Sequence, residues 1–368
     1  MLKPTYKLPD LPPPIELETV PILKALATAN RALAELKGRA ATIPNQGILI
    51  DTLALQEAKA SSEVENIVTT QDELFQADLF PEGPQSAPAK EVALYRDAVK
   101  LGHDRLRTTG GLVTNNTLID MFRLLKGRDD AFRATPGTTL NNDRTGEVIY
   151  IPPQDHTEIV ALMTALEQFI NDDEACPLDP LIKMALIHHQ FESIHPFADG
   201  NGRIGRILNV LYLTRTGLLE IPILYLSRHI TRTKADYYRL LQDVRDTNGA
   251  QTAWQAWVHY MLEAVADTAG TTLDLVEGIR GQMADVKRRM RSELPRLYSQ
   301  DLLNNLFRHP YTRIEFVTKD LGVTRQTAAK YLDTLAEHGF VAKHQAGRNN
   351  YYINTALVRL FLDVSGGR

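Results

Sequence analysis

One twelve-residue stretch, residues 195–206, contains most of the side chains that could carry out chemistry. It reads His-Pro-Phe-Ala-Asp-Gly-Asn-Gly-Arg-Ile-Gly-Arg, which combines a group that titrates near neutrality, a carboxylate, a glycine-rich turn and two arginines. A Gly-Asn-Gly turn that leads into a helix presents free backbone N–H groups, and such groups favour an anion. Arginines at the start of that helix can add bidentate contacts to phosphate. The stretch therefore predicts a phosphate site.

His195 and Asp199 extend this prediction from binding to catalysis. A carboxylate beside a phosphate site has an obvious partner in Mg²⁺ bound to the same phosphates. A histidine next to phosphate indicates proton transfer during phosphoryl chemistry. Because a free imidazole has a pKa of about 6.5, it suits a base that works near neutral pH.

Two other interpretations of this stretch remain open at this point. Residues 200–205 match the dinucleotide fingerprint GxGxxG, and Glu220 lies at a suitable distance downstream. That fingerprint requires a preceding buried strand, whereas the residues before His195 have a helical pattern. The stretch could also be an ordinary turn between two helices with surface charges, although His, Asp, Asn and two Arg seldom gather around such a turn.

The elements that must position these residues are mostly helices. Apolar residues recur at helical spacing in five segments, which are residues 17–41, 48–60, 90–108, 116–125 and 157–286. Residues 144–153 depart from this pattern, because they are β-branched and end in two prolines. They predict a small extended flap rather than a core strand. We therefore expect an all-α core with a small β flap.

The C-terminal residues predict a winged helix–turn–helix. Residues 314–321 and 324–338 have a helix–turn–helix rhythm, and residues 343–353 alternate like a two-stranded wing. Residues 301–368 carry nine Lys and Arg against six Asp and Glu, an excess of +3 that is modest for DNA binding. The side chains that could contact DNA are Thr324, Arg325, Gln326, Lys330, Lys343, His344, Arg348 and Asn349. Winged helices also dock proteins, so DNA is one of two partners to consider.

The predicted domains are 1–90, an N-terminal helical region; 91–297, the catalytic core; and 298–368, the winged helix–turn–helix.

The composition is that of an ordinary globular protein. Hydrophobic residues make up 43% and charged residues 23% of the 368 residues, and the net charge of −4 gives no general case for nucleic-acid binding. The single cysteine, Cys176, excludes an intrachain disulfide. The first residues lack the apolar segment of a signal peptide, and no uncharged apolar run reaches the ~18 residues that span a bilayer. We expect a cytoplasmic protein without a membrane partner.

The twelve residues resemble the signature of the Fic (filamentation-induced-by-cAMP) family, HPFx[DE]GNGRxxR, with every defined position filled. The resemblance implies an α-helical fold that transfers the AMP of ATP to a Ser, Thr or Tyr hydroxyl of a protein. It implies that His195 is the general base, that Phe197 anchors the loop in the core and that Asp199 holds Mg²⁺. The residues implied to bind the nucleotide are Gly200, Asn201, Gly202, Arg203, Gly205 and Arg206.

A second resemblance predicts a built-in inhibitor. Residues 61–66, Ser-Ser-Glu-Val-Glu-Asn, resemble the inhibitory motif of the family, [ST]xxxE[GN], formed here by Ser61, Glu65 and Asn66. In the family this glutamate reaches the second arginine of the signature, here Arg206, and so disturbs how ATP binds. The same residues also fit an ordinary helix capping box, in which Ser62 and Glu65 would begin a helix.

Three weaker features complete the predicted site. Family members carry a flap that pairs with the backbone of the target, and Tyr150 and Ile151 could line it or could only pack the hairpin. Tyr237 and Tyr238 resemble a tyrosine pair near the adenine, although such pairs are more often core. The adjacent residues His188 and His189 could suggest a metal site, but packing explains them better because neighbouring side chains point to different helix faces.

The sequence thus predicts an autoinhibited protein adenylyltransferase that uses Mg-ATP. Its target is another protein or the protein itself, and a homodimer could form. The alternatives are a transcriptional regulator that senses ATP and acts through the winged helix, and a Fic-fold enzyme that removes AMP.

Overall fold

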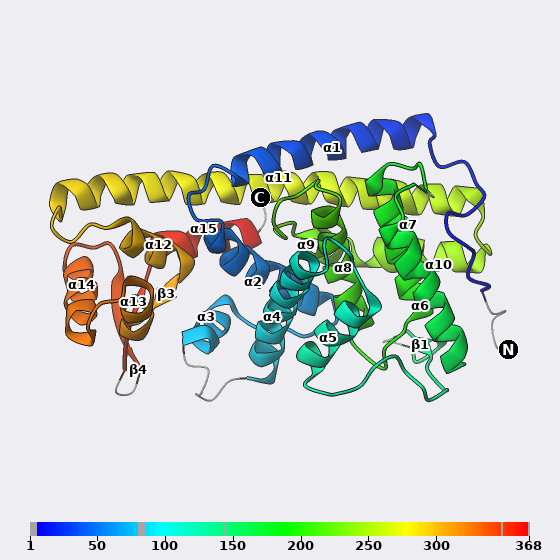
Figure 1. Ribbon diagram of the computed structural model, residues 1–368, viewed down its shortest axis with the longest axis horizontal. Helices are drawn as coiled ribbons and strands as arrows, with labels where there is room; N and C mark the ends of the chain where they lie inside the picture. The colour runs from blue at the N-terminus through cyan, green and yellow to red at the C-terminus, as the bar shows by residue number, and fades with distance from the viewer. Residues whose placement is uncertain (1–5, 80–85, 143–144, 175, 347–348, 367–368) are drawn as a thin grey trace.

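The computed structural model describes residues 6–79, 86–142, 145–174, 176–346 and 349–366. Within these residues the fold is almost entirely helical (Figure 1), which confirms the prediction of an all-α core. The helices are α1 (Val20–Ala40), α2 (Gly47–Val64), α3 (Gln71–Leu79), α4 (Ala87–Thr108), α5 (Asn115–Lys126), α6 (His156–Asn171), α7 (Pro180–Ile194), α8 (Asn201–Arg215), α9 (Leu226–Arg232), α10 (Lys234–Asp246), α11 (Gln251–Glu293), α12 (Gln300–Arg308), α13 (Ile314–Leu321), α14 (Arg325–Glu337) and α15 (Thr355–Gly366). The strands are β1 (Leu140–Asn141), β2 (Val148–Tyr150), β3 (Tyr311–Thr312), β4 (Ala342–Ala346) and β5 (Asn349–Ile353). Helix α3 was not among the predicted segments.

Helices α7 and α8 form the centre of the molecule. Every residue of α7 from Leu181 to Ile194 is buried, which explains why its sequence lacks a one-sided apolar stripe. The helix begins with Pro180, and the Asp179 side chain caps it by accepting a hydrogen bond from the backbone N–H of Leu181 at 2.8 Å. The chain then turns at residues 195–200 and begins α8.

Two long helices, α1 and α11, lie side by side along one edge of the molecule (Figure 1). Helix α1 buries Ile22, Leu26, Leu33 and Leu36 at helical spacing, as the sequence predicts, whereas Leu23 remains 44% exposed. Helix α11 also packs against α7, so it connects α1 to the central helices. The expected domain boundaries stay predictions; the one between residues 90 and 91 falls within the first turn of α4.

The predicted flap is a two-stranded ribbon. Strands β1 and β2 pair antiparallel, with Leu140 opposite Tyr150 and Asn141 opposite Val148. Arg144, the first residue of the predicted flap, lies outside the described residues. The ribbon is short because Pro152 and Pro153 follow β2 after a single residue, Ile151, and cannot donate ladder hydrogen bonds.

The C-terminal part contains the helices and hairpin that the sequence predicts. Helices α13 and α14 are joined by Gly322 in the left-handed conformation, and the three-stranded sheet has the order β3-β5-β4. Arg348 lies outside the described residues. Arg325 donates to Glu315 at 2.5 Å and Lys343 donates to Asp333 at 2.7 Å. Two of the side chains expected to contact DNA are therefore paired with carboxylates. DNA binding by this part remains a prediction.

Across the described residues, none of the helices has both the length and the apolar character needed to cross a membrane.

The close approach of α4, α5 and α8 depends on a glycine. A Cβ atom at Gly102 of α4 would lie 2.5 Å from Met121 Sδ and 2.6 Å from Leu211 Cδ1. Gly38 of α1 is exposed, and its Cβ would meet nothing within 4 Å. The two helical glycines therefore form a matched pair.

We predict opposite effects when each of these glycines becomes alanine. Gly102→Ala should lower the free energy of unfolding by about 1–3 kcal/mol because it overpacks the contact of three helices. Gly38→Ala should raise it by about 0.5–1 kcal/mol because alanine loses less backbone entropy in a helix. Urea denaturation followed by circular dichroism measures both, and equal effects at the two sites would contradict this account of the contact.

Candidate active site

The turn between α7 and α8 is fixed by its own residues. His195 ends α7 in the left-handed conformation, with φ of 51°, and its backbone N–H donates to the Phe191 carbonyl at 3.0 Å. Phe197 is fully buried and stacks on Phe122 with ring centroids 4.2 Å apart. Asn201 closes the loop, because its Oδ1 accepts from the Phe197 N–H and its Nδ2 donates to the Phe197 carbonyl, both at 2.8 Å. The Asn201 side chain therefore stabilises the turn, and only the backbone N–H of Asn201 could contact an anion.

The N-terminus of α8 follows this turn directly. Gly200 is the N-cap in the left-handed conformation, with φ of 76°, and no side chain caps the helix there. The first N–H groups of a helix have no intrahelical acceptors, and the helix dipole gives this end a partial positive charge. The N-terminus of α8 therefore has the form that the predicted anion site requires, and anion binding there remains a prediction. Gly202 and Gly205, which the sequence places in a glycine-rich interruption, lie inside the helix, and a helix rather than a strand precedes them. This excludes the dinucleotide fingerprint.

Arg206 of α8 is held by the segment that resembles an inhibitory motif. Its guanidinium is 1% exposed and donates to Ser61 Oγ at 2.8 Å, to the Ser61 carbonyl at 2.9 Å and to Glu65 Oε1 at 2.8 Å. A Cβ atom at Gly202 would overlap Glu65 Oε1, so a side chain at this position would displace the carboxylate from where it lies. Asn66, in the left-handed conformation, accepts a hydrogen bond from Lys234 Nζ at 2.9 Å. Glu65 and Asn66 thus line the pocket, and Ser61 holds Arg206 from behind the lining.

The capping-box interpretation of Ser62 and Glu65 is wrong. A capping box begins a helix, whereas α2 ends at Val64 with Glu65 as its C-cap residue. The backbone N–H of Glu65 bonds to the Ser62 carbonyl at 3.0 Å, as in the last turn of a helix. The spacing of four residues instead brings Ser61 and Glu65 to the same face of α2, toward Arg206.

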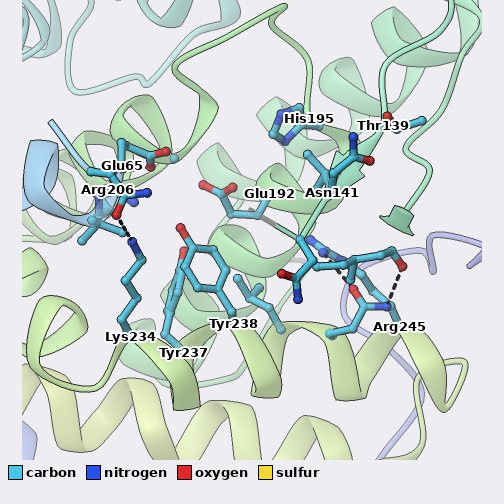
Figure 2. A pocket seen from close by; sticks show the side chains of 18 residues that line it. Glu65, Thr139, Asn141, Glu192, His195, Arg206, Lys234, Tyr237, Tyr238 and Arg245 are labelled. Carbon is cyan, nitrogen blue, oxygen red and sulfur yellow. Dashed lines mark hydrogen bonds and ion pairs between the residues drawn. The ribbon is translucent and has the colours of Figure 1, made fainter. Parts of the chain in front are cut away.

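The expected residues surround a pocket of about 620 Å³ (Figure 2). This volume is typical of a small-molecule site. Seven predicted residues line it: Glu65, Asn66, His195, Gly202, Arg206, Tyr237 and Tyr238. Eight others lie outside the lining: Ser61, Tyr150, Ile151, Asp199, Gly200, Asn201, Arg203 and Gly205. In Figure 2, His195 lies at the top of the pocket and the Glu65–Arg206 pair lies at its left.

Sequence reasoning missed several residues of the lining, which are Val64, Thr139, Leu140, Asn141, Asn142, Ile149, Glu192, Lys234, Leu241, Gln242 and Arg245. The sequence could have indicated that Glu192 lines the pocket. Glu192 precedes His195 by three residues and therefore lies on the same side of α7. Lys234 and Arg245 carry no such signal, since they belong to α10, which meets α7 and α8 only in the folded chain.

Burial favours the neutral forms of two groups of the pocket, His195 and Glu192. Burial, together with the positive charges of Arg245 and Arg133, lowers the pKa of His195 to about 4. The imidazole is therefore neutral at pH 7 and can accept a proton. Burial raises the pKa of Glu192 to about 7 despite the nearby charge of Arg206. Its Oε1 atom is buried and has no hydrogen-bond partner among the described residues.

Asp199 and Arg203 belong to a chain of ion pairs beside the pocket. Lys126 Nζ lies 2.5 Å from Asp199 Oδ2 and 3.3 Å from Glu91 Oε1, and Arg203 donates to Glu91 at 2.5 Å. The salt bridge with Lys126 outweighs burial and lowers the pKa of Asp199, so this carboxylate is ionised. Its side chain is 61% exposed. The described residues contain no cluster of three metal-ligating side chains. Asp199 therefore fits Mg²⁺ only as a single carboxylate, with nucleotide phosphates supplying further oxygens.

The tyrosine pair and the histidine pair have different surroundings. Tyr238 is 44% exposed at the pocket, whereas Tyr237 is buried and its hydroxyl lies in a 2.8 Å hydrogen bond with His188 Nε2. His188 Nδ1 accepts from Asn209 Nδ2 at 3.0 Å, and burial lowers the pKa of this histidine to about 3. His189 packs 4.5 Å from Trp254, ring centroid to centroid. Packing therefore explains both histidines.

The flap lines the pocket with Leu140 and Asn141 of β1 and with Ile149 of β2, and not with the expected Tyr150 and Ile151. Ile149 lines the pocket, while Tyr150 is buried and donates from its hydroxyl to the Ser193 carbonyl at 2.9 Å. Arg245 lies over the Tyr150 ring at 4.3 Å. The packing alternative therefore describes Tyr150, because successive strand residues point to opposite faces.

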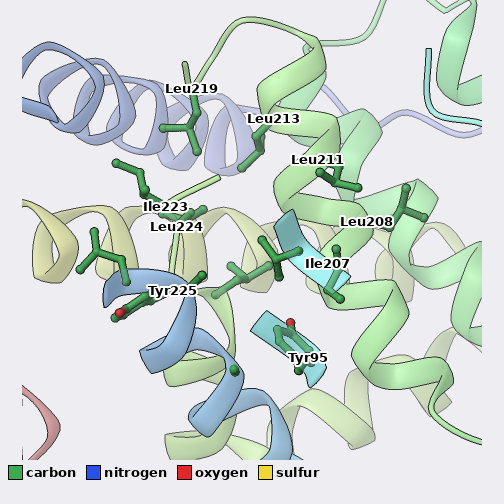
Figure 3. Close-up of a cluster of buried hydrophobic side chains, with 14 of the residues drawn as sticks. Tyr95, Ile207, Leu208, Leu211, Leu213, Leu219, Ile223, Leu224 and Tyr225 are labelled. Atoms are coloured by element: carbon green, nitrogen blue, oxygen red, sulfur yellow. The ribbon is translucent and has the colours of Figure 1, made fainter. Parts of the chain in front are cut away.

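An apolar cluster packs around α8 (Figure 3). Ile207, Leu208 and Leu211 of α8 gather near Tyr95 of α4. Further residues of the cluster are Leu219, Ile223, Leu224 and Tyr225. The position of the helix N-terminus therefore depends on a buried core and not on the loop alone.

Comparisons with known proteins agree along the chain. Residues 23–104 match the description "Fic/DOC family N-terminal", residues 113–213 match "Fic/DOC family", and residues 282–357 match "Protein adenylyltransferase SoFic-like, C-terminal domain". The protein adenylyltransferase fic-1 of Caenorhabditis briggsae is 29% identical over 131 residues, which cover 35% of this chain and 24% of the relative. The protein adenylyltransferase Fic of Drosophila melanogaster is 29% identical over 126 residues, which cover 34% and 22%. The match thus spans about a quarter of the length of these relatives.

Solved structures show the same fold. A Fic family protein from Desulfovibrio desulfuricans G20 aligns with a TM-score of 0.56 and 19% identity over 92% of this chain and 98% of its own. A fragment of Fic-1 from Caenorhabditis elegans aligns with a TM-score of 0.52 and 19% identity over 71% and 74%. The matched segments include the whole signature, and the shared fold extends beyond it. The chain therefore carries the N-terminal and core domains of the Fic/DOC family, followed by a SoFic-like C-terminal domain.

Proposed function

We propose that this protein is a protein adenylyltransferase that transfers AMP from Mg-ATP to a hydroxyl side chain of a protein. The observation that carries the proposal is that a neutral imidazole and a buried guanidinium, those of His195 and Arg206, line one pocket beside the N-terminus of α8. A helix N-terminus and an arginine suit phosphate, and a neutral imidazole suits proton removal. The relatives named as protein adenylyltransferases support the same activity.

In this proposal each group has a defined task. His195 accepts the proton of the target hydroxyl as its oxygen forms a bond to the α-phosphorus, and the bond from that phosphorus to pyrophosphate breaks. The N-terminus of α8 and Arg206 bind the phosphates, where negative charge develops on the leaving group. Tyr238, exposed in the pocket, offers a ring face to adenine. Mg²⁺, held by Asp199 and the phosphates, would neutralise part of their charge.

We further propose that Glu65 inhibits this activity. The carboxylate of Glu65 bonds to the Arg206 guanidinium at 2.8 Å and lies over Gly202. A phosphate oxygen that is to reach this guanidinium must therefore displace the carboxylate or accept repulsion from it. Because Ser61 holds Arg206 through two further hydrogen bonds, removal of Glu65 leaves the arginine positioned for phosphate.

Replacement of Glu65 tests the inhibition. We expect Glu65→Ala to raise the transfer of label from α-labelled ATP to protein by roughly tenfold or more, which corresponds to about 1.4 kcal/mol of relieved competition. Glu63→Ala is the matched control, because Glu63 lies on the same helical turn but pairs with Lys59. Label from γ-labelled ATP should stay off protein in every variant, since that phosphate leaves with pyrophosphate. Equal activity in the Glu65→Ala and wild-type proteins would refute the inhibition.

Replacement of His195 tests the chemistry. In the Glu65→Ala background, His195→Ala should reduce transfer by about 10²–10⁴-fold, the usual contribution of a general base, while ATP still binds. Calorimetric titration with ATP and Mg²⁺ checks the binding separately. Undiminished labelling by the His195→Ala protein would remove this histidine from the mechanism, and absence of ATP binding in all variants would overturn the proposed function as a whole.

A further inference from the structure

Arg133 is a buried arginine that the proposed chemistry does not use. It lies between α5 and β1, is 6% exposed and is absent from the lining of the pocket. Its Nε donates to the carbonyl of His195 at 2.8 Å, and its Nη2 donates to the carbonyl of Ile194 at 3.4 Å and to that of Pro153. One guanidinium thus contacts the backbone of the proposed base and the end of the flap.

The carbonyls that Arg133 contacts need a partner. The last carbonyls of a helix have no intrahelical donor, and the dipole gives the C-terminus of α7 a partial negative charge. His195 also adopts a left-handed backbone, which is costly for a residue that has a side chain. A cation with several donors stabilises this end, and the planar guanidinium suits acceptors on different segments.

The backbone of Arg133 joins the same segments. Its N–H donates to the Pro196 carbonyl at 2.8 Å, and its carbonyl accepts a hydrogen bond from His156 Nδ1 at 3.0 Å. Pro153 follows β2, and His156 begins α6. Arg133 therefore connects the signature turn, the end of the flap and the start of α6.

We propose that Arg133 is a positioning residue, which holds the backbone of His195 in its reactive conformation and links it to the flap that receives the target. This inference rests on the proposed function, because it takes His195 to be the base. Arg133 acts through His195 and does not contact the nucleotide pocket, so its replacement should affect turnover more than ATP binding.

The charge of Arg133 provides a second readout. The charged groups that influence the imidazole of His195 are Arg245 of α10 and Arg133, which both lower its pKa, and Glu65, which raises it. Removal of the Arg133 charge should therefore raise the pKa of His195. Because a base must be unprotonated, the acid limb of the rate profile should move to higher pH in the same variant.

The experiment compares Arg133→Gln and Arg133→Lys in the Glu65→Ala protein. We expect Arg133→Gln to lower kcat at least about tenfold through misplacement of the base, with the Kd for ATP changed less than about twofold. Lysine keeps the charge but cannot reach carbonyls on both segments, so Arg133→Lys should retain the pKa of His195 and show an intermediate kcat. Arg123→Gln is the matched control, because Arg123 Nε also donates to a backbone carbonyl, that of Asp130, at 3.1 Å.

A titration of the His195 imidazole by NMR, assigned with His195→Ala, is independent of activity. If His195→Ala still transferred AMP, the proposed function would fail while this titration still reported the contact. Unchanged kcat and an unchanged His195 titration in Arg133→Gln would overturn the positioning role. Should Arg133→Gln fail to fold, Arg133→Lys decides: a reduced kcat with normal ATP binding supports the proposal, and an unchanged kcat refutes it.

Discussion

The buried charge of Arg206 is the constraint on which the arrangement of the site depends. A guanidinium that is removed from water must be paired and hydrogen-bonded, because an isolated buried charge is far more costly than the pair. Here Ser61 and Glu65 supply these partners from a helix that lies some 140 residues earlier in the chain. The need to satisfy Arg206 therefore brings α2 against α8, and the same contact closes one side of the pocket.

Helix α2 is anchored independently of this ion pair. Glu57 and Ser61 lie one turn apart, and the buried carboxyl of Glu57 accepts hydrogen bonds from the Ser227 N–H at 3.1 Å and from the Tyr95 hydroxyl at 3.3 Å. Burial raises the pKa of Glu57 to about 7. At the other end of the helix, Arg308 of α12 donates to Asp51 at 2.5 Å. Glu65 can therefore act as a local ligand of Arg206, because the helix that carries it is held at several other points.

The turn between α7 and α8 joins two helix ends of opposite polarity. The C-terminus of α7 carries partial negative charge and faces the guanidinium of Arg133, while the N-terminus of α8 carries partial positive charge and faces the pocket. Asn201 and Phe197 fix the turn between them through paired hydrogen bonds and a buried ring. One turn, residues 195–201, thus positions both the proposed base and the proposed phosphate site, which explains why the signature is contiguous.

The sequence by itself determined the helical class, the signature turn and the pairing of Glu65 with Arg206, because these depend on periodicity, on contiguous residues and on a recognisable motif. It left open how Ser62 and Glu65 relate to a helix end, and only the structure showed that α2 stops there. Tertiary structure alone brought Glu192, Lys234 and Arg245 to the pocket, and it turned Tyr150 into the core in favour of Ile149. Arg133 also gave no local signal, since its partners are backbone carbonyls of distant segments. Such contacts depend on how whole helices pack. Every residue has a backbone carbonyl, so a sequence pattern cannot show which carbonyl a side chain will contact.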